Sequence, residues 1–206
     1  MLFRSDVIDN SIAEFEYHAD MARYMGYGDR FQDIKINVHL SGKGGVATFT
    51  DTFARLSDVA RNSITIENDE FSGTLDLCLQ ISHLCPVVLD IHHHYINSGE
   101  YISTDDSRIQ RVVDSWRGIK PVIHYSQSPR DILSKHCMFT KPDLSELLAS
   151  GHTKSKLRAH SDFYWNSAVN DWALSHLSWS DIMCESKAKN LAVKKLAKVL
   201  DKPVLV

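Results

Sequence analysis

The chain has 206 residues, of which 43% are hydrophobic and 24% are charged, and its formal net charge is −3. This composition is typical of a soluble globular protein with a sizeable core and excludes the low-complexity and disordered classes. No segment approaches the roughly 20 consecutive apolar residues of a bilayer span, and the N-terminus lacks the apolar region of a secretory signal, so we expect an intracellular protein. The four cysteines form no CxxC pair, which favours reduced thiols over a disulfide framework or a zinc site.

Charge is distributed unevenly along the chain. Residues 1–100 contain 7 Lys and Arg against 15 Asp and Glu, whereas residues 101–206 contain 16 against 11. A basic half can face an anion such as a phosphate backbone, although solvated helix faces give the same pattern, particularly near the C-terminus. The asymmetry alone is therefore weak support for a nucleic-acid partner.

Helix and strand patterns alternate along the sequence. The chain opens with a predicted helix over residues 11–25, followed by a strand over 34–39, a Gly-rich loop over 42–45, a helix over 47–60 and a strand over 64–67. The pattern continues with a helix over 73–84, a strand over 86–91, a helix over 105–117, a strand over 121–125, a strand over 180–185 and an amphipathic helix to about residue 200. This alternation predicts an α/β fold with a parallel sheet, most simply part of a (β/α)₈ TIM barrel.

The barrel predicted in this way is incomplete. A full barrel typically needs about 250 residues and eight strands, and the pattern offers five or six. Either residues 140–178 contain irregular strands, or the chain begins partway round the barrel, which the opening helix favours. We therefore expect one domain over residues 1–206 that lacks about the first three strands. Its open strand edges predict self-association or pairing with a separate N-terminal barrel segment.

Four predicted strands end in a side chain that commonly binds metal ions. These side chains are His39, Glu67, Asp90, which is followed by three histidines at 92–94, and His124. Side chains at the carboxyl ends of parallel strands lie where barrel enzymes place their chemistry. Because imidazoles and carboxylates together suit divalent transition ions, the pattern predicts a single metal site at this end of the sheet.

The three consecutive histidines allow more than one geometry. On an ideal strand Asp90, His92 and His94 share a face, whereas a chain that turns after Asp90 brings Asp90 and His93 together; a solvated loop is the alternative to both. Glu185 ends the last predicted strand, although it could instead be a first-turn helix glutamate favoured by the helix dipole. His160 is a further candidate ligand.

Six segments, in order and over nearly the whole chain, resemble the UV damage endonuclease family. The two that are specific when they occur together are Ile66-Glu67-Asn68-Asp69 and Leu89-Asp90-Ile91-His92-His93-His94; the others cover residues 11–19, 36–39, 123–126 and 159–162. The resemblance implies a metal-dependent barrel that nicks double-stranded DNA immediately 5′ to UV photoproducts, such as cyclobutane dimers and 6-4 products, with two or three divalent ions, Mn²⁺ or similar. Family members carry further strands upstream with a His-Pro-x-Gln segment, and this sequence has no counterpart of that segment.

The resemblance also implies roles for individual residues. The implied metal ligands are His39, Glu67, Asp90, His93, His124, His160 and Glu185. Of these, Glu67, Glu185 and His124 are assigned catalytic roles in metal-assisted hydrolysis of a phosphodiester. The predicted DNA contacts are Lys120, Tyr125, Ser126, Lys154, Lys156 and Arg158, with ordinary capping as the alternative for the two hydroxyls. If the cations bind DNA, affinity falls steeply with salt.

Two alternative functions remain open at this point. One is an inactive or partner-dependent DNA-binding remnant of the same family. The other is a metal-dependent sugar isomerase or epimerase, since related barrels use a similar cluster of Glu, Asp and His. The Asp-Ile-His-His-His and His-Tyr-Ser segments favour the nuclease over the isomerase, but they do not separate the nuclease from the remnant.

Overall fold

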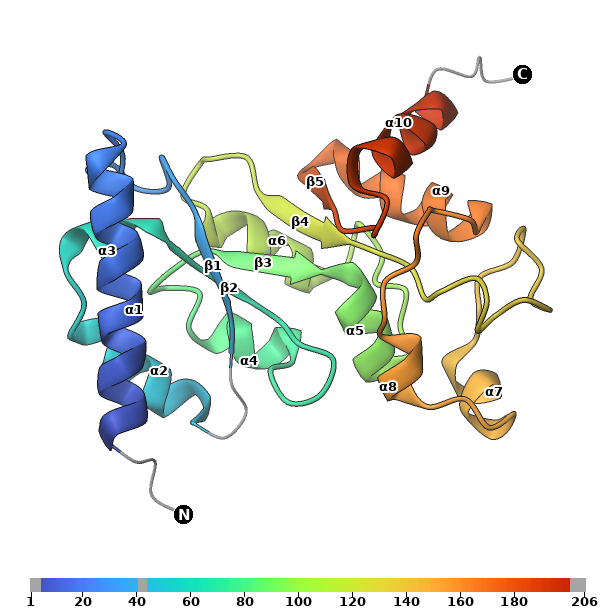
Figure 1. Ribbon diagram of the computed structural model, residues 1–206, viewed down its shortest axis with the longest axis horizontal. Helices are drawn as coiled ribbons and strands as arrows, with labels where there is room; N and C mark the ends of the chain where they lie inside the picture. The colour runs from blue at the N-terminus through green and yellow to red at the C-terminus, as the bar shows by residue number, and fades with distance from the viewer. Residues whose placement is uncertain (1–4, 41–43, 201–206) are drawn as a thin grey trace. The chain divides into compact units, whose positions relative to one another are not determined.

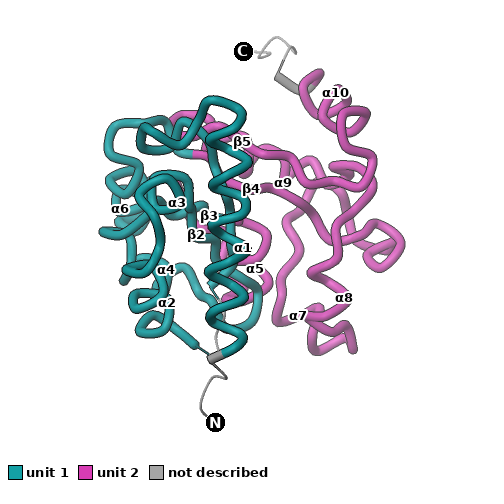
Figure 2. The backbone as a smooth tube through the Cα atoms, turned by 60° about the vertical axis from the view of Figure 1, so that its left-hand side comes forward, with its two compact units in different colours: residues 1–89, 105–121 teal, residues 90–104, 122–206 magenta. Residues whose placement is uncertain are grey.

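The computed structural model describes residues 5–40 and 44–200 (Figure 1). The chain divides into two compact units: unit 1 comprises residues 1–89 and 105–121, and unit 2 comprises residues 90–104 and 122–206 (Figure 2). None of the helices in the described ranges has the length and hydropathy that a bilayer span requires. The Gly-rich loop predicted over 42–45 lies partly outside the described residues.

Unit 1 is built on three parallel strands. In order across the sheet they are β1 (Ile36–His39), β2 (Ile64–Glu67) and β3 (Val87–Asp90), whose last residue, Asp90, is the first residue of unit 2. His39 is level with Glu67, and Glu67 is level with Val88, so the strands end at the same edge. All four residues of β2 and of β3 are buried, as expected for β-rich parallel strands covered on both faces.

The helices of unit 1 differ in detail from the prediction. They are α1 (Ser5–Tyr24), α2 (Gly45–Ala54), α3 (Asp58–Ser63), α4 (Leu75–Gln80) and α6 (Ser107–Ser115). The helix predicted over 47–60 is two helices, because the Ser57 hydroxyl accepts a hydrogen bond from Ala60 N at 3.2 Å and starts a new helix there. Helix α1 packs on α3, and α4 contacts α2, α6 and β2.

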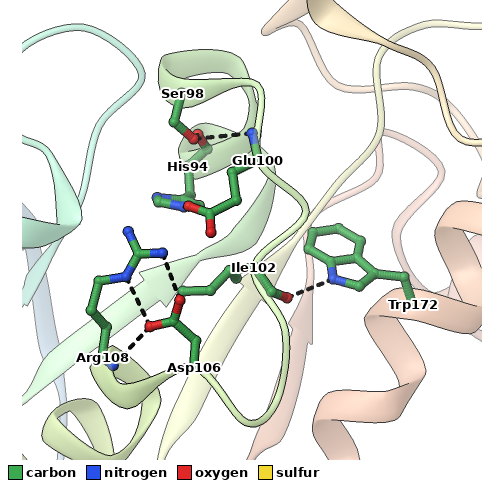
Figure 3. Close-up of polar contacts among 7 residues, drawn as sticks. All are labelled: His94, Ser98, Glu100, Ile102, Asp106, Arg108 and Trp172. Atoms are coloured by element: carbon green, nitrogen blue, oxygen red, sulfur yellow. Dashed lines mark hydrogen bonds and ion pairs between the residues drawn. The ribbon is translucent and has the colours of Figure 1, made fainter.

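Two buried side chains at the C-terminal end of α6 fix the beginning of β3. Trp116 is fully buried, and its indole Nε1 donates to Val87 O at 2.9 Å. The Ser115 hydroxyl accepts a hydrogen bond from Val87 N at 3.0 Å. At the other end of α6, Asp106 accepts from Arg108 N at 2.8 Å and pairs with the guanidinium of Arg108 (Figure 3). The backbone N–H and C=O of Val87, the first residue of β3, are therefore both held by side chains at the end of a well-capped helix.

Unit 2 contains two parallel strands and most of the short helices. Strands β4 (Val122–Tyr125) and β5 (Asp181–Cys184) pair with Val122 level with Asp181. The helices are α5 (Ile91–Ser98), α7 (Leu144–Ala149), α8 (Lys154–Leu157), α9 (Ser167–Ser175), a 3₁₀ turn η1 (His176–Ser178) and α10 (Lys189–Leu200). Residues 140–178 contain helices and turns and no strand, so irregular strands there do not explain the low strand count.

The core of unit 2 is aromatic and aliphatic. Tyr95 stacks on Tyr101 with ring centroids 4.5 Å apart, and both hydroxyls donate to Pro142 O at 3.0 Å. Trp172 of α9 donates from Nε1 to Ile102 O at 2.8 Å (Figure 3), which ties the loop after α5 to α9. The predicted α/β class with parallel strands is confirmed, while the described strands of each unit form an open sheet that does not close on itself.

Candidate metal centre

Asp90 is both the end of a strand and the cap of a helix. Its Oδ1 accepts hydrogen bonds from His92 N at 2.8 Å and His93 N at 2.7 Å, so α5 starts directly after β3 (Figure 1). Of the geometries that the sequence allowed, the structure has the one in which the chain turns after Asp90 and brings it beside His93. His93 Nδ1 lies 3.5 Å from Asp90 Oδ2. The Asp90 side chain is fully buried, and that of His93 is 12% exposed. The strand-to-helix junction therefore presents a carboxylate and an imidazole together.

The two neighbouring histidines have other partners. Burial lowers the pKa of His92 to about 3, with smaller contributions from His93 and His160, so this imidazole is neutral at ordinary pH. His94 Nε2 lies 2.9 Å from Glu100 Oε2, whose backbone N–H donates to Ser98 Oγ at 3.1 Å (Figure 3). His92 and His94 therefore serve the packing and anchoring of α5.

Strands β4 and β5 supply the next two candidate ligands. Glu185 lies one residue beyond β5, and its backbone N–H donates to Tyr125 O at 2.9 Å, which continues the ladder. His124 Nδ1 lies 3.2 Å from Glu185 Oε1. Asp90, His124 and Glu185 each offer a ligand atom, and these atoms lie within 4.8 Å of one another.

His160 lies on the same side of unit 2. Its ring centroid is 6.3 Å from that of His93, and its segment is fixed because Ser161 N donates to Gln127 O at 2.8 Å. Burial alone would raise the pKa of Glu185, but the hydrogen bond and charge of His124 outweigh it, with smaller effects of His160 and His93, and the pKa is lowered. Five of the seven predicted ligands thus gather in unit 2: Asp90, His93, His124, His160 and Glu185.

The side chains of this cluster fit a divalent metal ion. Two carboxylates within 4.8 Å of each other, one of them fully buried, repel each other unless a cation lies near them. Three imidazoles beside them complete a mixed nitrogen and oxygen donor set, which suits Mn²⁺ and other divalent transition ions. The carboxylates can also hold more than one ion, because each has two oxygens.

Unit 1 holds the other two predicted ligands. His39 Nε2 lies 4.0 Å from Glu67 Oε2, and the side chain of Glu67 is 3% exposed while that of His39 is 50% exposed. The amide of Asn37 donates to Glu67 Oε2, and Asn37 Oδ1 accepts from the Thr65 hydroxyl at 2.8 Å. Sequence reasoning missed Asn37, although its position two residues before His39 on the same strand face was an available signal.

The loop after β2 is built by Asp69. Its Oδ1 accepts from the backbone N–H groups of Phe71 at 2.7 Å, Ser72 at 2.6 Å and Gly73 at 2.9 Å. Burial alone would raise the pKa of Asp69, but these hydrogen bonds lower it. Asp69 thus shapes the turn that follows Glu67.

The predicted DNA contacts are in different environments. Tyr125 and Ser126 are 0% and 1% exposed, and the Tyr125 hydroxyl donates to Asn170 Oδ1 at 2.7 Å. Because successive strand residues face opposite sides, Tyr125 points away from the side of His124. Lys154 donates to Asn97 O at 2.6 Å, while three others are exposed: Lys120, Lys156 and Arg158.

Comparisons with known proteins agree on one family. A family model described as UV-endonuclease UvdE matches residues 3–204. The UV-damage endonuclease of Schizosaccharomyces pombe is 28% identical over 210 residues, which cover 95% of this chain and 31% of that protein. The UV-damage endonuclease of Neurospora crassa is 28% identical over 153 residues, covering 62% of this chain and 23% of that protein.

A solved structure is similar as well. The crystal structure of SacUVDE matches with a TM-score of 0.69 and 27% identity, and the match covers 97% of this chain and 61% of that chain. The chain therefore spans about a quarter to a third of the length of the two curated relatives and about three fifths of the solved chain.

Proposed function

Since this chain belongs to the UV-endonuclease UvdE family, we propose that it is a DNA repair endonuclease that nicks the backbone immediately 5′ to UV photoproducts, namely cyclobutane dimers and 6-4 products. The observation that carries the proposal is the cluster of Asp90, His124 and Glu185 in unit 2, with ligand atoms within 4.8 Å of one another. The family match favours this function over the sugar isomerase that the sequence left open. The substrate on this proposal is damaged double-stranded DNA inside the cell.

The proposed metal ligands in unit 2 are the five side chains of the cluster, those in unit 1 are Glu67 and His39, and the proposed ions are two or three Mn²⁺. Support for Glu67 comes from unit 1 itself, where its buried carboxylate lies 4.0 Å from His39 Nε2, measured from Oε2. Divalent ions held there supply activation of water and stabilisation of charge on the phosphoryl oxygens. The chain is also proposed to form one domain over residues 1–206 with the architecture of a partial (β/α)₈ barrel, which its parallel strands support.

The protein's own residues have distinct tasks in this proposal. Asp90 and Glu185 provide the negative charge that balances a divalent cation, and the helix cap at Asp90 holds its carboxylate in place. His124 orients Glu185 through the contact of 3.2 Å from Nδ1 to Oε1. Asn37 orients Glu67 in the same way. Selection of lesions follows from the lower energy needed to unstack damaged bases.

A second candidate, the inactive or partner-dependent remnant, has an observation of its own. Among the described residues, β1 pairs with β2 alone, which leaves one strand edge available for another chain segment or a second copy. The chain also spans only 61% of the solved relative. On this alternative, metal and DNA bind but the backbone is cut only when the partner segment is added.

A plasmid assay separates these possibilities. Supercoiled plasmid, UV-irradiated or not, is incubated with the protein and Mn²⁺ or EDTA, and conversion to the nicked circle is measured. We expect nicking of irradiated plasmid with Mn²⁺ only, a loss of more than about 100-fold in Glu185→Gln, and no change in Glu146→Gln, an exposed glutamate of α7. Folded protein that binds Mn²⁺ and never nicks supports the remnant, and full activity of Glu185→Gln contradicts the proposed site.

A further inference from the structure

Unit 2 has a large groove beside α10 that lies outside the metal cluster. The α10 groove has a volume of about 840 Å³ and is walled by residues 129–131 and 138–139, by residues 161–165, Ser167 and Asn170, and by residues of α10 and the segment before it. Four of its lining residues are cationic: Arg130, Lys187, Lys195 and Lys198. All four are exposed, and two carboxylates, Asp131 and Asp162, face them in the lining.

Positive charge at the groove contrasts with the chain as a whole, whose formal net charge is −3. Lysines on an amphipathic helix are commonly just its solvated face, so charge alone does not identify a ligand. The groove also exposes aromatic rings: Phe139 is 72% exposed and Phe163 is 37% exposed. Singly exposed phenylalanines are normal on a protein surface, so the two rings point to a ligand only in combination with the cations beside them.

One pair within the groove joins the two kinds of side chain. The ammonium group of Lys195 lies 5.2 Å from the ring centroid of Phe163, in a cation–π arrangement. A nucleotide carries a phosphate and a planar base side by side, so a lysine next to a phenylalanine matches both parts. An acidic peptide would match the charge and leave the rings unused. Bases in an intact duplex are stacked inside and do not reach such rings, so the exposed rings favour unpaired nucleotides.

The groove starts where the candidate metal ligands end. Lys187 N donates to Ser161 O at 3.0 Å, and Ala188 N donates to Asp162 O at 3.1 Å. Ser161 follows His160 directly, and Lys187 is two residues beyond Glu185. The two backbone hydrogen bonds therefore join the groove walls within two residues of the candidate ligands His160 and Glu185.

We propose that the α10 groove binds an unpaired stretch of the DNA strand that flanks the cleaved phosphate. In this arrangement phosphates lie against Lys187, Lys195 and Lys198, and bases stack on Phe139 and Phe163. The proposal rests on the proposed function for its substrate class. It adds a binding site for nucleotides that do not belong to the lesion, and it predicts that the groove binds single-stranded DNA without any lesion.

Binding is tested without catalysis. Fluorescence anisotropy of a labelled twelve-nucleotide oligothymidine is measured in EDTA, over a series of salt concentrations, with the full chain. Phe139→Ala removes an exposed ring, and we expect affinity to fall about 5-fold or more, since stacking contributes about 1–3 kcal/mol per base. Lys195→Gln should make the slope of log affinity against log salt shallower by about 0.7. Lys194→Gln, a neighbouring exposed lysine that does not line the groove, should leave both quantities unchanged.

Several outcomes overturn the proposal. They are equal affinity of Phe139→Ala and the unchanged chain, equal effects of Lys194→Gln and Lys195→Gln, or displacement of the oligonucleotide by polyglutamate at matched charge. Failure of the proposed function is seen separately in the plasmid assay, because oligonucleotide binding in EDTA needs no cleavage. Glu185→Gln should bind the oligonucleotide as the unchanged chain does and fail to nick.

Discussion

We expect replacement of Asp90 by asparagine to stabilise the protein without metal and to leave it less stable than the unchanged chain when Mn²⁺ is added. The amide oxygen of asparagine can still accept the hydrogen bonds from His92 N and His93 N, so the cap of α5 is kept. The negative charge is lost, however, and with it the repulsion between Asp90 and Glu185, whose ligand atoms lie within 4.8 Å of each other. Two charges at that distance interact by about 3.5 kcal/mol at an effective dielectric constant of 20 and by about 0.9 kcal/mol in bulk water.

We therefore expect Asp90→Asn to raise the free energy of unfolding by about 1–3 kcal/mol in EDTA at pH 8, where histidines are ordinarily neutral. With Mn²⁺ at 100 times its dissociation constant, the unchanged chain gains about 2.7 kcal/mol. The variant should gain much less, so the order of stability inverts. Urea unfolding followed by circular dichroism measures the free energy of unfolding of the unchanged chain and of Asp90→Asn, each in EDTA and in Mn²⁺.

Two further variants complete this experiment. Asp90→Ala loses the cap as well as the charge and should be about 1 kcal/mol less stable than Asp90→Asn. Asp143 caps α7 by accepting from Glu146 N at 2.9 Å, and Asp143→Asn should respond to Mn²⁺ like the unchanged chain. The reasoning is refuted if Asp90→Asn is destabilised in EDTA, or if Mn²⁺ stabilises it as much as the unchanged chain.

Three other predictions concern the fold that supports the site. Burial lowers the pKa of His176 to about 4, so the unfolded state binds more protons than the folded state between about pH 4 and 6.5. The contribution of this histidine to stability is therefore full above that range and falls as the pH drops through it. The loss, about 2 kcal/mol between pH 7 and 5, should be absent when His176→Asn is unfolded in urea. Tyr125→Phe removes the buried hydrogen bond to Asn170 and should cost about 1–2 kcal/mol of stability while oligonucleotide affinity, measured by anisotropy, stays unchanged. A Cβ at Gly73 would lie 2.4 Å from Leu40 O, so Gly73→Ala should lower the free energy of unfolding by more than about 1 kcal/mol, and an unchanged melting curve would contradict this close approach.

The sequence predicted the strands well because their residues carry a strong local signal. The β-branched runs ending at His39, Glu67 and Asp90 became β1, β2 and β3, and His124 and Glu185 lie at β4 and just after β5. Parallel strands bring their carboxyl ends to one edge, so the candidate ligands could be proposed from the strand ends and the resemblance.

Other features depend on tertiary structure and could not be predicted in this way. The start of α5 at Ile91 depends on the Asp90 carboxylate, which accepts hydrogen bonds from the backbone N–H groups of His92 and His93. This turn decides which of the three histidines lies beside Asp90. The burial of Tyr125 depends on Tyr164, which stacks on it at 4.9 Å and lies 39 residues away. The α10 groove combines three separate segments, none of which has a distinctive pattern by itself.

Cleavage of a defined lesion tests the central claim most directly. A duplex with a single cyclobutane dimer and a label on the damaged strand is incubated with the protein and Mn²⁺, and the product is sized at nucleotide resolution beside the same duplex without the dimer. The proposed function predicts one cut immediately 5′ to the dimer, no cut in the undamaged duplex and no cut by Glu185→Gln. Equal cutting of both duplexes, or a cut elsewhere that Glu185→Gln also makes, would contradict a lesion-specific nuclease centred on this cluster.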